Sequence, residues 1–359
     1  MFNWRLPRTI LQWPGRPQRQ GNERWLDDMK KKKFSKIVAL GLALGVFTFS
    51  GCRSVTPPAI HPTTVEVALD GTGKFTSVQE AIMSVPIGSR TNPVVIHIKP
   101  GTYHELIYVQ REKRFFRLIG DDVNKTIITF GLYANMTNLD GKPIGTFRTP
   151  TAIIDAEDFV AENLTFENSA GPKGQALAIR VDGDRAAFQN CYFLGWQDTI
   201  FINRGRDYFD HCYIEGATDF IFGGATAWFQ SCHIHCAGSG YIAAASTPYD
   251  AAYGYVFANC KITGEPDAQT SLGRPWRVFA STIYLNTEMS DVVRPAGWDA
   301  WGKADATKTR YAEFNSTGAG ANPAARPKWS RQLTAAEAAK ITVQKVLGGL
   351  DGWNPLADR

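Results

Sequence analysis

The sequence of 359 residues predicts an all-β protein built as a parallel β-helix. The first observation is a repeat of 21 residues. Two consecutive copies of one pattern place Cys212 21 residues after Cys191, and Asp219 21 residues after Asp198. The second is that the repeat is rich in aromatic and β-branched residues and too short to bury an apolar face alone, so neighbouring copies must stack. The third is uneven spacing between constant motifs, which indicates fixed coils with loops of variable length on one side.

The repeat continues in both directions along the chain. Cys232 follows Cys212 by 20 residues, Cys260 follows after another 28, and Leu164 takes the cysteine position in an upstream copy. Strands in register stack about 4.8 Å apart. Equivalent residues of neighbouring coils are therefore expected to lie one rung apart.

This stacking brings two carboxylates together. Asp198 and Asp219 are expected roughly 5 Å apart, where two like charges repel by ~3 kcal/mol at an effective dielectric of ~20, or about two pKa units. One carboxyl should then keep its proton near neutral pH while the other is ionised, which suits a general acid beside a nucleophile. The alternative interpretation is a polar ladder on a solvated coil face.

The charge distribution argues against a nucleic-acid binder. The formal net charge is +5, but residues 1–51 contribute +7 through ten Lys/Arg and three Asp/Glu, which leaves about −2 for the other 308 residues. A nucleic-acid-binding domain would carry a basic patch on its folded part. The length and the repeat favour one large domain.

The N-terminal segment predicts export. We interpret residues 1–28 as an upstream extension, residues 29–51 as an export signal with a basic start and an apolar run, residues 52–64 as a linker, and residues 65–359 as the β-helix domain. The apolar run is shorter than a membrane span of about 20 residues. Cys52 follows Ser-Gly, as in a bacterial lipobox, and predicts a lipid anchor in the outer membrane, although Phe49 replaces the usual Leu. The alternative is a plain secretory peptide and a periplasmic or secreted product.

Local signals place the elements along the domain. Residues 70–82 are expected to form a turn that leads into a helix, capped by Thr76 or Ser77, which should close the open end of the coils. The other expected elements are strands at 64–68 and 94–98, a new coil from 101, a loop at 133–150, and a helix at 333–343 with Thr334 and Glu337 as capping residues.

The cysteines leave two possibilities open. Four of them occupy equivalent coil positions, where neighbours could form a disulfide or remain buried thiols: Cys191, Cys212, Cys232 and Cys260. Cys232 and Cys236 with His233 and His235 could suggest zinc, but alternate strand residues face opposite ways and no second cluster completes four ligands. We expect neither a metal nor a cofactor.

Five motifs in order resemble the pectin methylesterases, or pectinesterases. They lie at residues 101–105, 175–179, 195–199, 219–223 and 272–276. The resemblance extends from about residue 64 to 353 and implies a right-handed, single-stranded parallel β-helix. It also implies hydrolysis of the methyl esters of homogalacturonan (pectin) to free carboxylates and methanol.

The resemblance assigns roles by position. Asp219 corresponds to the nucleophile, Asp198 to the general acid and then base, and Arg274 to the partner of Asp219. Gln175 and Gln197 correspond to oxyanion-hole donors, and their separation of 22 residues is again one coil. The remaining implied contacts are with the substrate: Trp276, Thr146 and Phe222.

Two features depart from the family pattern. By similarity to bacterial members, Cys212 and Cys232 are expected to form a disulfide, but Cys191 one coil earlier leaves the pairing open. A lipidated N-terminus is similar to that of the bacterial, lipoprotein-like branch of the family, some of whose members are suspected of acting on thioesters. The second hypothesis is therefore a thioesterase or another carboxylesterase on the same scaffold. A third is a non-catalytic polysaccharide-binding solenoid. For the first hypothesis the expected partner is methyl-esterified pectin and the expected state a monomer.

Overall fold

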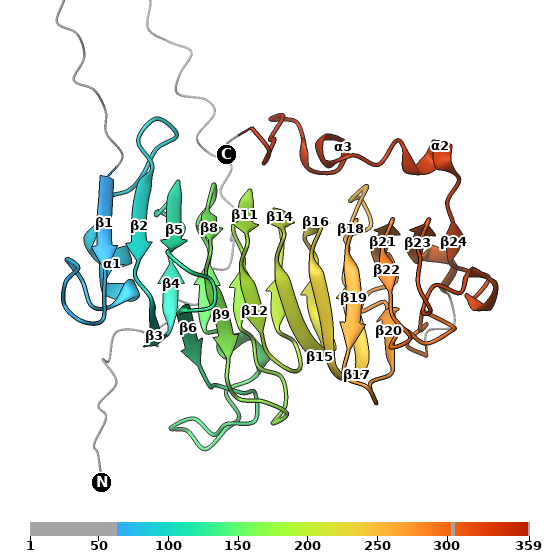
Figure 1. Ribbon diagram of the computed structural model, residues 1–359, viewed down its shortest axis with the longest axis horizontal. Helices are drawn as coiled ribbons and strands as arrows, with labels where there is room; N and C mark the ends of the chain where they lie inside the picture. Colours follow the sequence, from blue (N-terminus) through green and yellow to red (C-terminus); the bar gives the residue numbers. More distant parts are fainter. Residues whose placement is uncertain (1–62, 303–305, 358–359) are drawn as a thin grey trace, which may run out of the picture. The chain divides into compact units, whose positions relative to one another are not determined.

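The computed structural model describes residues 63–302 and 306–357, which form stacked coils of parallel strands (Figure 1). The strands belong to two sheets of 11 and 13 members. The described part of the chain is therefore a parallel β-helix, as the sequence predicts. The predicted extension, export signal, Cys52 and most of the linker lie outside the described residues.

The first column of strands is the 11-stranded sheet. Its in-register parallel pairs run from one end of the domain to the other. It consists of β1 (Thr63–Val67), β2 (Val94–Ile98), β5 (Phe116–Gly120), β8 (Val160–Glu162), β11 (Ala186–Gln189), β14 (Arg206–Asp210), β16 (Thr226–Gln230), β18 (Tyr255–Ala258), β21 (Ser281–Leu285), β23 (Arg310–Phe314) and β24 (Arg331–Gln332).

The 13-stranded sheet contains the other two columns, which share β15 (Tyr213–Gly223) and β17 (His233–Ala245). These two strands are long because each crosses from the second column to the third without a break. The rest of the second column is β3 (Gly101–His104), β6 (Thr126–Phe130), β9 (Thr165–Asn168), β12 (Tyr192–Leu194), β19 (Lys261–Gly264) and β22 (Glu288–Met289). The rest of the third column is β4 (Ile107–Val109), β7 (Ala152–Ile154), β10 (Ile179–Val181), β13 (Ile200–Ile202) and β20 (Thr270–Gly273).

A left-handed residue turns the chain after seven first-column strands, with φ between 48° and 55°. These residues are Asn163, Asn190, His211, Ser231, Asn259, Asn286 and Asn315. Asparagine tolerates this conformation better than most residues. The Asn190 side chain also donates to Asn163 Oδ1 at 2.7 Å, so the corners are linked from coil to coil.

The core explains the aromatic position of the repeat. Five rings at one position of successive coils are stacked, with neighbouring centroids 4.5–4.9 Å apart and planes inclined by 9–13°. They belong to Phe188, Phe209, Phe229, Phe257 and Tyr284, all fully buried. Such pairs add about 0.5–1.5 kcal/mol each beyond the burial of their area.

The structure differs from the predicted disulfide. Cys212 and Cys232 are buried free thiols, and they donate to the carbonyl oxygens of Phe188 (3.5 Å) and Phe209 (3.6 Å) on the preceding coil. Burial raises the pKa of the Cys232 thiol well above its ordinary value, which suppresses the thiolate that disulfide formation requires. The alternative of buried thiols in a dry core is the one that the structure contains.

The histidines beside these cysteines face the other way. His233 Nε2 and His235 Nδ1 both hydrogen-bond Thr263 Oγ1, at 2.7 and 2.9 Å, whereas Cys232 and Cys236 are in the core. The strand alternation that argued against a zinc site is therefore present. Within residues 63–302 and 306–357, no group of three or more His, Cys, Asp and Glu could hold a metal ion.

Helix α1 (Val78–Ser84) closes the N-terminal end of the coils, as predicted. Its N-cap is Ser77, whose side chain accepts from Glu80 N. Glu105, from the first of the five motifs, accepts from Ser77 Oγ (2.7 Å) and from Val78 N (2.8 Å). A carboxylate at this end also suits the helix dipole, so this motif position has a structural role.

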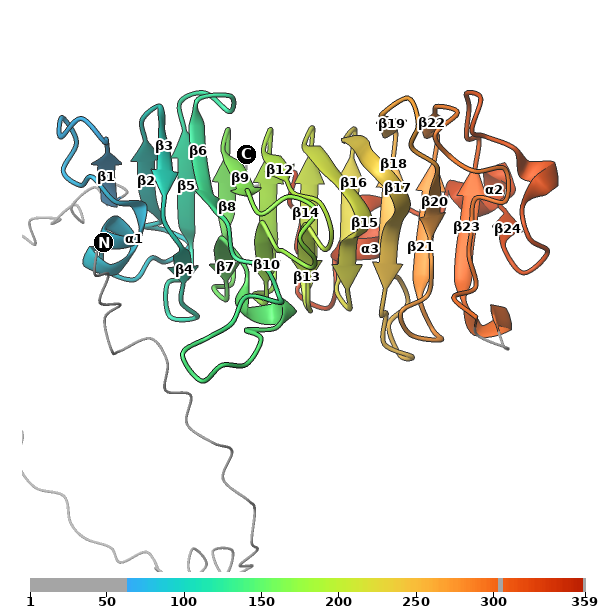
Figure 2. The ribbon, with the colours of Figure 1, turned by 90° about the horizontal axis from the view of Figure 1, so that it is seen from below.

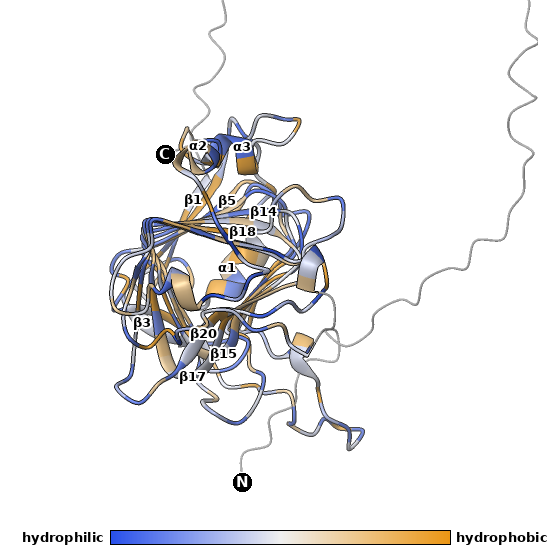
Figure 3. Cartoon of the chain, turned by 90° about the vertical axis from the view of Figure 1, so that its right-hand side faces the viewer, coloured by the Kyte–Doolittle hydropathy of each residue, from blue (hydrophilic) through white to orange (hydrophobic). Residues whose placement is uncertain are grey.

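The C-terminal segment runs outside the first column (Figure 3). The capping box of Thr334 and Glu337 is confirmed, but the predicted single helix is two: α2 (Ala335–Ala338) and α3 (Val343–Leu347). The second helix exists because the Thr342 side chain accepts from Lys345 N and caps a new start. Apolar residues of this segment, including Leu347, pack on outward side chains of the first column such as Val256.

The loop predicted at 133–150 is present and projects from the coils (Figure 2). It contains η1 (Thr146–Arg148), and the described residues include two other short 3-10 helices, η2 (Ala306–Lys308) and η3 (Pro323–Ala325). In the part of the chain that the structure describes, no helix has the length and apolar character needed to span a membrane.

Candidate active site

The coil register brings the two predicted aspartates to neighbouring rungs. Gln197 pairs with Gln175 on one side and with Thr218 on the other, so Asp198 is equivalent to Asp219. Asp198 N donates to Thr218 O at 3.0 Å, which ties the two positions together. Both side chains are about nine-tenths buried, and both backbones are left-handed, with φ of 66° and 52°. The central spacing argument from the sequence is confirmed.

Local irregularity in β15 orients this pair. The register with β17 shifts between Gly216 and Thr218, and again between Thr218 and Ile221, the interval that contains Asp219. Such bulges redirect a side chain within a strand. Gly216 is required there, because a Cβ would lie 2.3 Å from the Cβ of Phe220.

Arg274 holds Asp219 at two points. Its Nε donates to Oδ1 at 2.8 Å and its Nη2 to Oδ2 at 2.6 Å. The arginine directly follows β20, and its backbone N–H donates to Ala243 O at 2.9 Å. A two-point bond between a guanidinium and a carboxylate fixes orientation as well as charge, so Asp219 is the fixed anion of the pair.

Asp198 has the opposite environment. Burial and the neighbouring charge of Asp219 together raise the pKa of Asp198 to about 8, although the charge of Arg274 acts in the other direction. Asp198 is therefore protonated near neutral pH and can donate a proton, while Asp219 is paired with a cation. This division of roles between two adjacent carboxyl groups is the one that acid-assisted nucleophilic attack requires.

The two glutamines lie beside the carboxyl pair on successive rungs. The backbone of Gln175 pairs with that of Gln197, and both residues are half-buried. Neither side-chain amide hydrogen-bonds to another group within the described ranges. Both amides are therefore available to a ligand oxygen placed near the carboxyl groups.

Aromatic side chains border the site on the outside of the third column. The rings of Phe201 and Phe222 stack at 4.7 Å, and Trp276 lies 5.7 Å from Phe222. Phe147, in η1 directly after Thr146, reaches Phe201 at 4.9 Å. The structure thus brings all three predicted substrate contacts, or their immediate neighbours, to one surface.

Sequence reasoning missed several members of this surface. Phe201 had a signal, since it follows Asp198 by three residues just as Phe222 follows Asp219. The repeat supplied no such signal for Tyr241 and Trp301. Their ring centres lie 4.0 and 3.9 Å from Arg274 Cζ.

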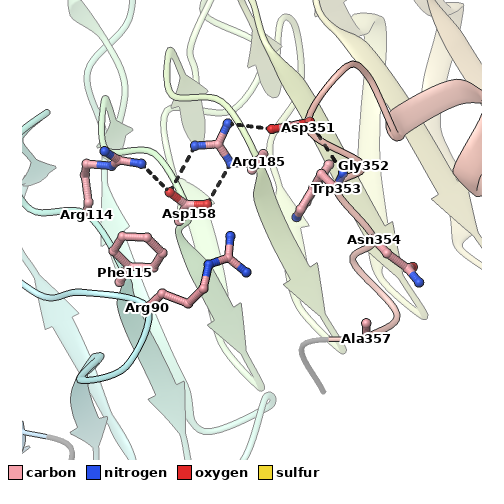
Figure 4. A pocket seen from close by; sticks show the side chains of 10 residues that line it. All are labelled: Arg90, Arg114, Phe115, Asp158, Arg185, Asp351, Gly352, Trp353, Asn354 and Ala357. Atoms are coloured by element: carbon pink, nitrogen blue, oxygen red, sulfur yellow. Dashed lines mark hydrogen bonds and ion pairs between the residues drawn. The ribbon is translucent and has the colours of Figure 1, made fainter.

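A separate cavity of about 400 Å³ lies where the C-terminal segment crosses the coils (Figure 4). It is lined by Arg90, Arg114, Phe115, Asp158, Arg185, Asp351, Gly352, Trp353, Asn354 and Ala357. Asp158 bonds Arg114 and Arg185 at 2.8 and 2.7 Å, and Arg185 contacts Asp351 at 3.2 Å. The Arg185–Asp351 pair attaches the C-terminal segment to the coils, and none of the candidate catalytic residues lines the cavity.

The Pectinesterase family model matches residues 64–350 of the chain. The chain belongs to the pectinesterase family. Among curated pectinesterases, it is 42% identical to Pectinesterase 31 of Arabidopsis thaliana over 282 residues, which cover 76% of this chain and 89% of that protein. It is 37% identical to Putative pectinesterase 11 of the same plant over 298 residues, 81% of each chain.

Solved pectinesterase structures share the fold. Pectin methylesterase from carrot has a TM-score of 0.75 and 32% identity, covering 86% of this chain and 98% of that one. Pectin methylesterase PemA from Erwinia chrysanthemi has a TM-score of 0.70 and 32% identity, covering 82% and 98%. The fold and the family expected from the five motifs are confirmed, whereas the narrower placement in a bacterial, lipoprotein-like branch is not supported by the curated plant relatives.

Proposed function

We propose that this chain hydrolyses the methyl esters of homogalacturonan, with Asp219 as the nucleophile and Asp198 as the general acid and base. The observation that carries the proposal is one carboxylate held by Arg274 beside a second carboxyl whose pKa is raised to about 8. The family supplies the substrate, because the similar proteins are pectinesterases and pectin methylesterases.

In the first half of the reaction, Asp219 attacks the ester carbonyl carbon. The carbonyl oxygen gains the negative charge, and the side-chain amides of Gln175 and Gln197 donate to it. Each such donor lowers the barrier by roughly 3 kcal/mol. When the tetrahedral intermediate collapses, the bond to the methoxy oxygen breaks, Asp198 protonates that oxygen, and methanol leaves. The galacturonyl group remains joined to Asp219 as an anhydride.

In the second half, Asp198 has lost its proton and acts as a base. It takes a proton from a water molecule, which attacks the galacturonyl carbon of the anhydride. The bond to Asp219 breaks, the product carboxyl group forms, and Asp198 is protonated again. Ester and water give acid and methanol, and both aspartates return to their starting states.

The aromatic surface beside the carboxyl pair supports a sugar polymer as the substrate. Phe222 and Trp276 offer ring faces on which pyranose rings can stack, and Thr146 lies in the projecting loop next to Phe147. A pectin methylesterase solved in complex with a hexasaccharide is similar to this chain, with a TM-score of 0.71 and 33% identity. We assign Thr146, Phe222 and Trp276 to substrate contact on this basis.

Methanol release from methylated pectin by the purified protein tests the proposal. Wild-type protein should release methanol, and Asp219→Asn should release none while keeping the fold and melting temperature. A parallel assay of thiol release from an acyl thioester addresses the thioesterase hypothesis. Release of thiol without methanol would refute the pectinesterase assignment, and binding of pectin without either product would favour the polysaccharide-binding hypothesis.

We further infer that the protein is exported as a monomer and carries a lipid on Cys52, which would anchor it in an outer membrane. The basic and apolar segments before Ser-Gly-Cys52 support export and lipidation. Mass spectrometry of the natural N-terminus checks it: a diacylglyceryl-modified Cys52 is expected. A free N-terminus at another residue would instead identify a plain secretory signal.

A further inference from the structure

The guanidinium of Arg274 lies between two aromatic rings. Its Cζ atom is 4.0 Å from the ring centre of Tyr241 and 3.9 Å from that of Trp301. Both contacts are shorter than the roughly 6 Å within which a cation interacts with a ring face. The edge of the same guanidinium carries the two hydrogen bonds to Asp219.

Three separate segments build this arrangement. Tyr241 belongs to β17, Arg274 follows β20, and Trp301 lies in the loop after β22. Asp299 joins the two rings, because it accepts from the Tyr241 hydroxyl at 3.4 Å and from the backbone N–H of Trp301 at 2.5 Å. The rings are therefore held relative to each other independently of the arginine.

The arrangement restricts the arginine in the direction that its hydrogen bonds leave free. Two bonds in the guanidinium plane resist sliding within that plane, whereas rings against its faces resist tilting out of it. Rings also displace water from those faces, so the charge acts on Asp219 with less screening. The Arg274 side chain is only 17% exposed, in agreement with this enclosure.

We propose that Trp301 and Tyr241 are positioning residues, an aromatic clamp that keeps the Arg274 guanidinium coplanar with the Asp219 carboxylate. The clamp acts through Arg274 on the direction and charge of the nucleophile. This inference rests on the proposed function, since it explains how the proposed nucleophile is held. The five family-like motifs contain neither residue.

A different role for Trp301 makes a distinguishable prediction. Trp301 also packs against the cluster of Leu177, Phe201, Phe222 and Ala244, so a sugar could in principle stack on it. Loss of a stacking contact raises KM and leaves the pH profile in place. Loss of the clamp lowers kcat and changes the pH at which the nucleophile becomes active.

The test compares Trp301→Leu, Trp301→Phe and Tyr241→Leu with wild-type protein in methanol release. For the two leucine variants we expect kcat to fall about tenfold, KM to change less than twofold, and the acid limb of the kcat/KM profile to move up by about one pH unit. Trp301→Phe keeps a ring and should recover most of kcat. Tyr192→Leu, a half-buried aromatic on the outside of the second column, is the matched control and should leave kcat unchanged.

Each outcome has a distinct consequence. An unchanged kcat and acid limb in both leucine variants would overturn the clamp, and the methanol release of wild-type protein would still support the proposed function. A raised KM with unchanged kcat and pH profile would assign Trp301 to substrate stacking and also overturn the clamp. Melting temperatures are measured for every variant. Loss of folded protein lowers kcat without moving the acid limb of the pH profile. A lower kcat therefore supports the clamp only when the acid limb is shifted as well. Inactive wild-type protein would refute the proposed function itself.

Discussion

Asp198→Asn should stabilise the protein at neutral pH while it removes catalysis. The Asp198 carboxyl is about nine-tenths buried, and its pKa is raised to about 8 because burial and the charge of Asp219 both disfavour ionisation. Asparagine has almost the same shape and no charge to lose. It also accepts the left-handed backbone of this position, where φ is 66°.

The magnitude follows from proton linkage. The native carboxyl keeps its proton between pH 3.8 and about 8, whereas the unfolded chain releases it near 3.8. The native state therefore binds more protons in this window, and the free energy of unfolding falls by up to about 1.4 kcal/mol for each pH unit. The cost of Asp198 reaches about 4 kcal/mol at pH 7 and is absent below pH 4.

Urea unfolding of wild-type protein and Asp198→Asn at several pH values between 4 and 8 measures this cost. The two proteins should have equal stability near pH 4, and the variant should become more stable as the pH rises, by at most about 4 kcal/mol at pH 7. Asp140→Asn, a change at an exposed carboxylate of the projecting loop, is the matched control and should follow the wild type. A stability difference that is independent of pH, or one that grows toward acid, would refute the proposed proton distribution between Asp198 and Asp219.

Three further predictions concern Asp198, Arg274 and a separate buried ion pair between Arg326 and Glu313. The value of kcat/KM should fall as the pH rises through about 8, because Asp198 then loses the proton that methanol needs; a constant value up to pH 10 would contradict this assignment. Arg274→Lys should lower kcat by about 100-fold, since one ammonium cannot reproduce the two-point bond to Asp219; near-wild-type turnover in the methanol assay would show that a point charge suffices. Arg326→Met should lower the free energy of unfolding by about 3–5 kcal/mol, because it leaves the Glu313 carboxylate without a cation where both side chains are 2% exposed, with only the Trp298 N–H still donating to it. The double variant with Glu313→Leu should recover part of that loss in urea unfolding, since the buried Trp298 N–H then lacks its acceptor; equal stability of the single and double variants would argue against it.

The fold was predictable because a β-helix converts sequence spacing into distance. The 21-residue interval between Asp198 and Asp219 matches the interval between Cys191 and Cys212, and the register of neighbouring coils makes both pairs equivalent. Backbone hydrogen bonds fix that register, so a residue's place in the repeat determines its neighbours on the next rung.

Contacts outside the register could not be predicted in this way. Trp301 lies next to Arg274 because loops leave the coils and return, and no interval in the repeat encodes their path. The docking of Leu347 on the first column likewise depends on where the chain turns after the last coil. The disulfide expected for Cys212 and Cys232 came from similarity to other members, and the core of this chain holds both as thiols.

Two different features position the side chains of the site: the stacking of the coils and the contacts of Arg274. Stacked rungs place Gln175, Gln197, Asp198 and Asp219 with the accuracy of a β-sheet, but they bring two acids into one buried position, which costs stability. Arg274 offsets that cost only if it stays in the plane of one carboxylate, and a side chain with its many rotamers does not do so unaided. In the proposed clamp Tyr241 and Trp301 supply that restraint, and neither of them belongs to the motifs from which the sequence predicted Arg274 and Asp219.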